Sequence, residues 1–107
     1  MEKLKIETLQ KLCKNSNIVW SVHALERMQE REISKSDVLN VIMNGKIIED
    51  YPKAFPYPAC LILGIDLSER SLHVVCGSNG TIVKIITAYY PNEEKFTQSG
   101  ETRKESI

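Results

Sequence analysis

The fold of this chain is decided by residues 72–90, which read LHVVCGSNGTIVKIITAYY. Hydrophobic and β-branched residues dominate both halves of the stretch, as is typical of β-strands. Its Asn79-Gly80 pair is the strongest short turn signal in the chain, because both residues tolerate the backbone of a tight hairpin turn. The stretch therefore predicts strands over residues 72–76 and 81–90, joined by a hairpin over residues 77–80.

Two more strands are expected before this hairpin, over residues 46–51 and 59–66. The loop over residues 52–58 separates them and contains three prolines, each of which lacks the N–H group that a sheet ladder needs. Residues 67–70 form a short polar connection. The second half of the chain therefore predicts a four-stranded, mainly antiparallel sheet.

The first half of the chain has helical periodicity. Apolar residues recur at helical spacing up to about residue 14, and Ser21 is a natural N-cap for a second helix over about residues 22–32. Ser34 and Asp37 resemble a capping box for a third helix, which we expect to end at Asn44 with Gly45 in a left-handed conformation. Between the first two helices, residues 18–20 are a brief β-prone run.

Helices followed by strands predict an α+β fold, with the N-terminal helices packed on one face of the sheet. At 107 residues the chain has single-domain length. We expect one domain over residues 1–96 and a flexible polar tail over residues 97–107.

Composition excludes several classes of function. Fourteen basic residues balance fourteen acidic ones, so nucleic-acid binding would need a local basic patch. We find no secretory signal, no membrane-spanning stretch, no metal-ligand spacing and no cofactor motif. The cysteines, Cys13, Cys60 and Cys76, are odd in number and widely spaced. They predict buried thiols in a reducing cytoplasm.

The second helix carries a row of cationic side chains. His23, Arg27 and Arg31 are spaced four residues apart and fall within an arc of about 80°. Val22, Leu25 and Met28 lie on a separate arc that we expect to face the core. Guanidinium groups bind phosphate and imidazole can transfer a proton near neutral pH, so the row suits an anionic ligand. A solvated helix whose arginines pair with Glu26 and Glu30 explains the same charges.

A second candidate group lies on the sheet. Strict alternation places Thr87 and Tyr89 on one face of the last strand and Lys84 on the opposite face. Pairing through the hairpin would bring Thr87 and Tyr89 beside His73, whose neighbours on the same face are Val75 and Gly77. The predicted site is therefore His23, Arg27, Arg31, His73, Thr87 and Tyr89. The alternative for His73 is a structural residue, half or fully buried.

The stretch over residues 21–34, SVHALERMQEREIS, resembles the pattern S-x-H-A-x-x-R-M-x-x-R-x-I-S of a small bacterial family known as domain of unknown function 4258. Residues 44–52, 72–75 and 86–91 are similar to later parts of that family, in the expected order. The resemblance covers about residues 18–96.

This resemblance implies a distant relationship to the RelE, ParE and BrnT toxins, and so a fold shared with microbial ribonucleases. Many such proteins resemble the toxin of a toxin–antitoxin pair, and members of the wider group cleave RNA without metal. RNA and a small antitoxin protein are the implied partners. The chain departs from RelE-like ribonucleases in being neutral rather than markedly basic.

Three hypotheses follow. The first is a metal-independent endoribonuclease toxin in which His23 or His73 is the base, Arg27 and Arg31 stabilise the phosphorane, and Tyr89 assists. The second is a non-catalytic module of the same fold that binds protein or nucleic acid. The third is a structural domain whose histidines complete buried hydrogen bonds.

Overall fold

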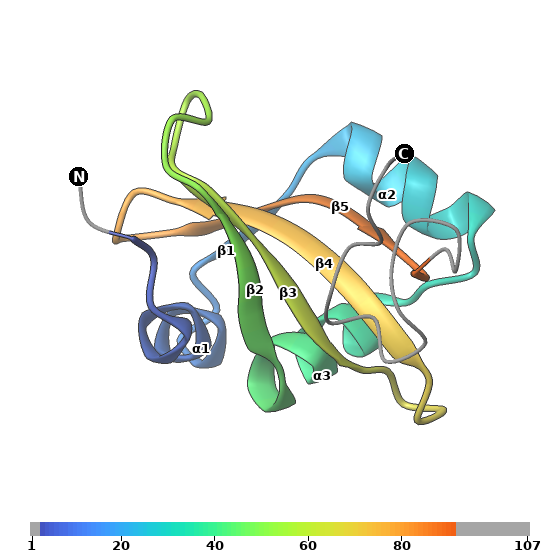
Figure 1. Cartoon of the computed structure of the whole chain (residues 1–107). Coiled ribbons are helices and arrows are strands. Elements are labelled where there is room, and N and C mark those ends of the chain that lie inside the picture. Colours follow the sequence, from blue (N-terminus) through green and yellow to red (C-terminus); the bar gives the residue numbers. More distant parts are fainter. Residues whose placement is uncertain (1–2, 92–107) are drawn as a thin grey trace, which may run out of the picture.

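The computed structural model describes residues 3–91 as an α+β fold, which confirms the predicted class (Figure 1). The helices are α1 (Ile6–Lys14), α2 (Val22–Glu30) and α3 (Lys35–Asn44). The strands are β1 (Ile18–Trp20), β2 (Lys46–Tyr51), β3 (Ala59–Ile65), β4 (Ser71–Ser78) and β5 (Val83–Tyr89). The predicted tail over residues 97–107 lies outside the described residues.

The sheet has five strands in the order β1-β5-β4-β3-β2, so the prediction of four strands was wrong. The additional strand is β1, which pairs in parallel with β5, whereas the other three neighbouring pairs are antiparallel. A three-residue strand is too short to show a period of two. Its partner also lies far along the chain, so no local pattern reveals the pairing.

The starts of α2 and α3 agree with the predicted caps. The Ser21 hydroxyl accepts a hydrogen bond from the Ala24 N–H at 3.0 Å, and Ser34 and Asp37 form a complete capping box. The prediction for Gly45 was wrong, because its backbone is extended, with φ of −93°. Glycine is needed there for space: a Cβ would collide with the carbonyl oxygens of Val41 and Leu63.

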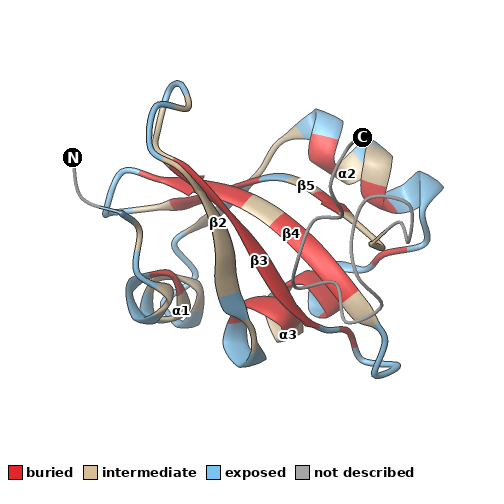
Figure 2. Ribbon diagram, in the orientation of Figure 1, coloured by how far each residue is buried: buried red, intermediate tan, exposed pale blue. Residues whose placement is uncertain are grey.

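One hydrophobic core joins all three helices to one face of the sheet. Figure 2 shows the buried residues concentrated along β3 and β4 and on the inner sides of the helices. On β4, Leu72, Val74 and Cys76 belong to this core, as alternation predicts. On α2 the core residues are Ala24 and Met28, whereas Val22 is 74% exposed, so its predicted place in the core was wrong. The inward-facing stripe begins at Ala24, two residues after Val22 and still within the first turn of the helix.

No helix within residues 3–91 has both the length and the apolar character that crossing a membrane requires.

Candidate functional site

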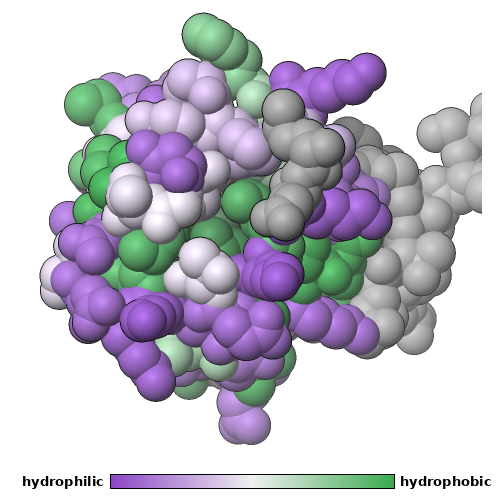
Figure 3. Space-filling model, turned by 90° about the vertical axis from the view of Figure 1, so that its left-hand side faces the viewer, coloured by the Kyte–Doolittle hydropathy of each residue, from purple (hydrophilic) through white to green (hydrophobic). Residues whose placement is uncertain are grey.

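A pocket of about 330 Å³ lies between the start of α2, the sheet and the proline-rich loop that joins β2 to β3. The loop projects from the body of the molecule (Figure 1), and Figure 3 shows hydrophobic atoms at the top, where the loop projects. Phe55 in this loop is 96% exposed. The pocket is lined by residues from all three parts: Ser21, His23, Phe55, Pro56, Tyr57, Gly77, Lys84 and Ile86.

The pocket contains paired residues of β4 and β5. Gly77 of β4 is the register partner of Lys84 of β5, so the two residues share one face of the sheet. A Cβ on Gly77 would lie 3.2 Å from the Pro58 carbonyl oxygen and 3.6 Å from Cβ of Tyr57. The absence of a side chain at Gly77 therefore lets the loop approach the sheet and form one wall of the pocket.

The predicted face of Lys84 was wrong, because the β4–β5 ladder contains an irregularity. Cys76 pairs with Ile85 and Val75 pairs with Thr87, so Ile86 is an extra residue on β5. Such a bulge shifts the alternation by one residue. Lys84 therefore lies on the same face as Thr87 and Tyr89, the face turned away from the core.

His23 reaches the pocket from the first turn of α2. Ser21 holds this end of the helix, since its hydroxyl caps Ala24 and also donates a hydrogen bond to the Ile85 carbonyl oxygen at 3.4 Å. The helix start is thereby attached to β5, one residue from Lys84. The imidazole of His23 is exposed and so accessible to a ligand.

The pocket combines three kinds of chemistry. His23 can accept or donate a proton near neutral pH, and Lys84 supplies a positive charge. Phe55 and Tyr57 supply aromatic rings beside these two groups. None of its lining residues is Asp or Glu. An anionic ligand with a flat, partly apolar group fits this combination.

Both arginines of the predicted site have partners within the protein. Arg27 forms an exposed ion pair with Glu30 at 3.1 Å, the pairing expected of a solvated helix. Arg31 donates hydrogen bonds to the Thr87 hydroxyl at 3.2 Å and to the Ala88 carbonyl oxygen at 2.9 Å. The structure therefore brings Arg31 and Thr87 together and attaches the end of α2 to β5.

His73 and Tyr89 form a second contact on the same face of the sheet. They are register partners, and their rings meet edge to face with centroids 5.4 Å apart. His73 is fully buried and does not line the His23 pocket. Along β4 it is four residues from Gly77, about 13 Å at the usual rise of a strand. The structure thus brings four predicted residues together in two pairs, but it does not bring His73 into the His23 pocket.

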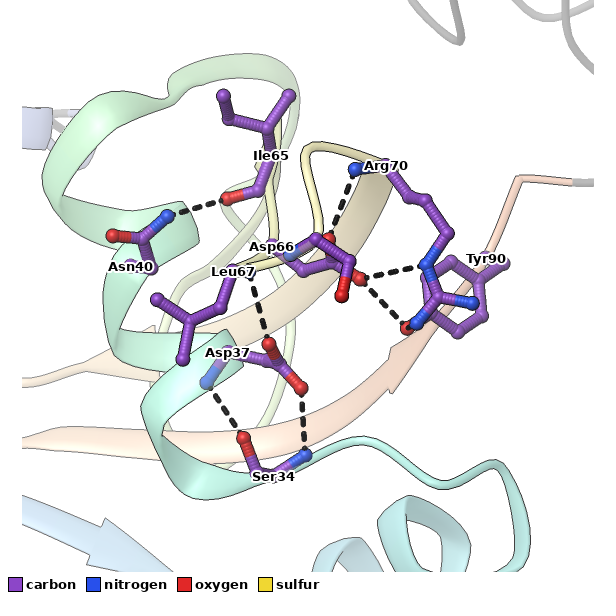
Figure 4. Close-up of polar contacts among 9 residues, drawn as sticks. Ser34, Asp37, Asn40, Ile65, Asp66, Leu67, Arg70 and Tyr90 are labelled. Atoms are coloured by element: carbon purple, nitrogen blue, oxygen red, sulfur yellow. Dashed lines mark hydrogen bonds and ion pairs between the residues drawn. The ribbon is translucent and has the colours of Figure 1, made fainter.

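A polar cluster at the opposite end of β4 went unnoticed in the sequence (Figure 4). The carboxylate of Asp66, only 1% exposed, accepts hydrogen bonds from the backbone N–H groups of Ser68 and Arg70, the Arg70 guanidinium and the Tyr90 hydroxyl. The Arg70 guanidinium also stacks over the Tyr90 ring at 4.5 Å. These contacts fix the β3–β4 connection, so the cluster has a structural role.

The electrostatics of the cluster agree with that role. Burial opposes ionisation of Asp66, but its hydrogen bonds and the Arg70 charge outweigh burial and lower its pKa. Asp37 has a lowered pKa for a similar reason, since the N–H groups of Ser34 and Leu67 donate to its carboxylate despite its burial. Burial and the hydrogen bond to Asp66 raise the pKa of Tyr90 to about 12.

These shifts predict acid sensitivity. The folded pKa values of Asp37 and Asp66 lie below the unfolded values of about 4, so the unfolded chain binds more protons. Their contribution to stability is present above that pH and is lost as the pH falls through the folded pKa values. We expect the urea midpoint to fall on acidification from pH 5, and to fall less steeply in Asp66→Asn. An equally steep fall in the variant would contradict this account.

The cysteines are unsuited to nucleophilic chemistry. Cys60 and Cys76 are buried register partners on β3 and β4, and their mutual hydrogen bond together with burial raises the pKa of Cys76. Burial raises the pKa of Cys13 to about 11. Thiols with raised pKa values are poor nucleophiles near neutral pH. Within residues 3–91 no group of three or more His, Cys, Asp or Glu residues could hold a metal ion.

Comparison with known proteins gives one match. Residues 20–90 match the model of a family described as a domain of unknown function (DUF4258). No curated protein and no solved structure matches the chain. The matched span includes every residue that lines the His23 pocket, the Arg31–Thr87 and His73–Tyr89 contacts and the Asp66 cluster. Since the match extends over more than half of the sequence, the chain belongs to the DUF4258 family.

Proposed function

We propose that this chain is an endoribonuclease that cleaves RNA phosphodiesters without a metal ion, as the toxin of a bacterial toxin–antitoxin pair. The observation that carries the proposal is the shared pocket of His23 and Lys84, walled by Phe55 and Tyr57. A proton-transfer group, a cation and aromatic rings are the three features that binding and cleaving a nucleotide linkage require.

The proposed reaction is an internal attack within the RNA. The His23 imidazole takes the proton of a ribose 2′-hydroxyl, and the 2′-oxygen forms a bond to the adjacent phosphorus. Lys84 stabilises the negative charge that develops on the phosphorane oxygens. The bond between phosphorus and the 5′-oxygen breaks, and the leaving oxygen takes a proton from the Lys84 ammonium group. The products are a 2′,3′-cyclic phosphate and a 5′-hydroxyl end.

The loop aromatics have a binding role in this proposal. Bases stack on exposed aromatic rings with a free energy of about 1–3 kcal/mol each, largely independent of sequence. Phe55, at 96% exposure, and Tyr57 lie on the same wall of the pocket. They would hold the bases that flank the scissile bond and so compensate for the neutral overall charge of the chain.

The remaining residues of the predicted site extend this proposal along α2 and β5. Arg27 and Arg31 follow His23 on the helix and would contact the RNA backbone beyond the pocket. Thr87, through its hydrogen bond with Arg31, and Tyr89 with His73 support that surface. A RelE-like relationship of the fold is part of the same proposal, and the α+β fold with its mixed sheet is compatible with it.

The test uses the purified full chain and a panel of single-stranded RNA oligonucleotides in EDTA. We expect cleavage that leaves 2′,3′-cyclic phosphate ends, identified by mass spectrometry. Matched oligonucleotides with 2′-O-methyl groups should stay intact, because they lack the nucleophile. Intact RNA across the whole panel would contradict the proposal, and binding without cleavage would favour the alternative of a non-catalytic nucleic-acid-binding module.

A further inference from the structure

A second cavity, of about 400 Å³, lies at the same end of the sheet as the His23 pocket, on the core side of β4 where α1 packs. Pro58 and Ser78 line the second cavity, whereas their chain neighbours Tyr57 and Gly77 line the first. The Ser78 N–H donates to the Pro58 carbonyl oxygen at 3.1 Å, which joins these two segments. A strip of backbone only one or two residues wide therefore separates the two cavities.

The second cavity is polar and basic. Lys3, Lys5 and Thr8 line it from the N-terminal segment and α1, and Ser78 and Asn79 line it from the end of β4. Figure 3 faces the end of the molecule where the N-terminal segment meets the β4–β5 hairpin, and hydrophilic side chains are prominent there. Both lysines are exposed, so their ammonium groups are accessible to a ligand.

The charged residues that line the two cavities are all basic. The two cavities together are lined by Lys3, Lys5, His23 and Lys84, and by no Asp or Glu residue. A third pocket, on the outer side of α2, is lined by Glu26, Gln29 and Glu30. The balanced overall composition therefore conceals a local cationic surface of the kind that steers and holds polyanions.

We propose that the second cavity binds a phosphate of the same RNA strand, next to the phosphodiester that occupies the His23 pocket. This inference rests on the proposed function and adds a flanking subsite to it. Gly77 faces away from the core and Ser78 faces toward it, so the two cavities lie on opposite sides of this strip. The strand would cross the end of the sheet at Gly77 and Pro58 for its neighbouring phosphate to reach Lys3 and Lys5. The subsite uses two residues outside the span that matches the DUF4258 family.

The experiment measures binding of the full chain to fluorescent 2′-O-methyl RNA, which cannot be cleaved. We compare the wild type with Lys3→Gln/Lys5→Gln, and with Lys11→Gln/Lys14→Gln as a control of equal charge at the other end of α1. Loss of one phosphate contact on a single strand lowers the slope of log K against log salt by about 0.7. We expect the magnitude of the slope to fall by about 0.7, and the binding of an eight-nucleotide RNA to weaken, in the Lys3/Lys5 variant alone. A dinucleotide, which contains one phosphodiester, should bind the variant and the wild type equally.

The outcomes separate the two proposals. If the wild type binds and cleaves RNA but the Lys3/Lys5 variant keeps its slope and affinity, the flanking subsite is wrong and the proposed function stands. An equal loss in the Lys11/Lys14 variant also overturns the subsite, because the effect is then one of net charge. If the wild type binds no RNA, both proposals are wrong.

Discussion

Replacing His23 with alanine is expected to lower the rate of RNA cleavage by about 10²- to 10⁴-fold, the usual contribution of a general base. The imidazole is exposed at the start of α2, and Ser21 rather than His23 caps the helix. The variant should therefore fold normally, with an unchanged urea midpoint. We expect kcat to fall and KM to stay the same, because His23 takes the proton only in the transition state.

Two further variants make this result specific. Lys84→Gln should also lower kcat, since it removes the charge that stabilises the phosphorane. Val22→Ala is the matched control, because Val22 precedes His23, is 74% exposed and does not line the pocket. Induced expression of the wild type should arrest bacterial growth, whereas His23→Ala should not. Full activity in His23→Ala would remove the imidazole from the mechanism.

Replacing Asp66 with alanine is expected to lower the free energy of unfolding by about 2–4 kcal/mol. Four donor groups point at this buried carboxylate, and hydrogen bonds to a charged group contribute about 1.5–3 kcal/mol each. Because the Arg70 side chain is exposed, water can form hydrogen bonds with its guanidinium in place of the lost Asp66 carboxylate. The decrease in the free energy of unfolding should therefore be well below the summed contributions of the four hydrogen bonds.

Urea unfolding at neutral pH measures this effect. The control is Ser68→Ala, which keeps the backbone N–H that donates to Asp66 and removes only an exposed hydroxyl. We expect this control to stay within about 0.5 kcal/mol of the wild type. If Asp66→Ala were as stable as Ser68→Ala, the cluster would not be holding the β3–β4 connection.

Local signals in the sequence predicted the helices well. Ser21, Ser34 and Asp37 cap helices because their side chains satisfy backbone N–H groups within three residues, and such contacts depend on short spacing alone. The alternation of β4 was predicted for a similar reason, since one face of a regular strand lies on the core. The left-handed backbone predicted for Gly45 was wrong because glycine is needed there for close packing against the Leu63 backbone of β3, which lies far along the chain.

The pocket could not be predicted, because it depends on contacts between distant segments. The bulge at Ile86 moves Lys84 to the face of Thr87, and an alternating pattern cannot show where the alternation breaks. The proline-rich loop approaches β4 closely at Gly77, where a Cβ would lie 3.2 Å from the Pro58 carbonyl oxygen. Two aromatic residues between prolines, Phe55 and Tyr57, were the available signal.

The polar cluster shows the same limit. Residues 66–70 have the composition of a solvated turn, and nothing local distinguishes a buried aspartate from an exposed one. Burial of Asp66 follows from Tyr90, which arrives from the end of β5, and from the neighbouring α3. Polar residues in this segment therefore predict a turn, but they do not predict which of their side chains are buried.

The central claim is that RNA binds at the His23 pocket, and proton NMR of the two imidazoles tests it most directly. The chain has only two histidines, so His23 and His73 each give a distinct set of ring signals. During titration with 2′-O-methyl RNA, the account predicts saturable shifts of the His23 signals and far smaller shifts of those of buried His73. Unchanged His23 signals at RNA concentrations that saturate binding would contradict it.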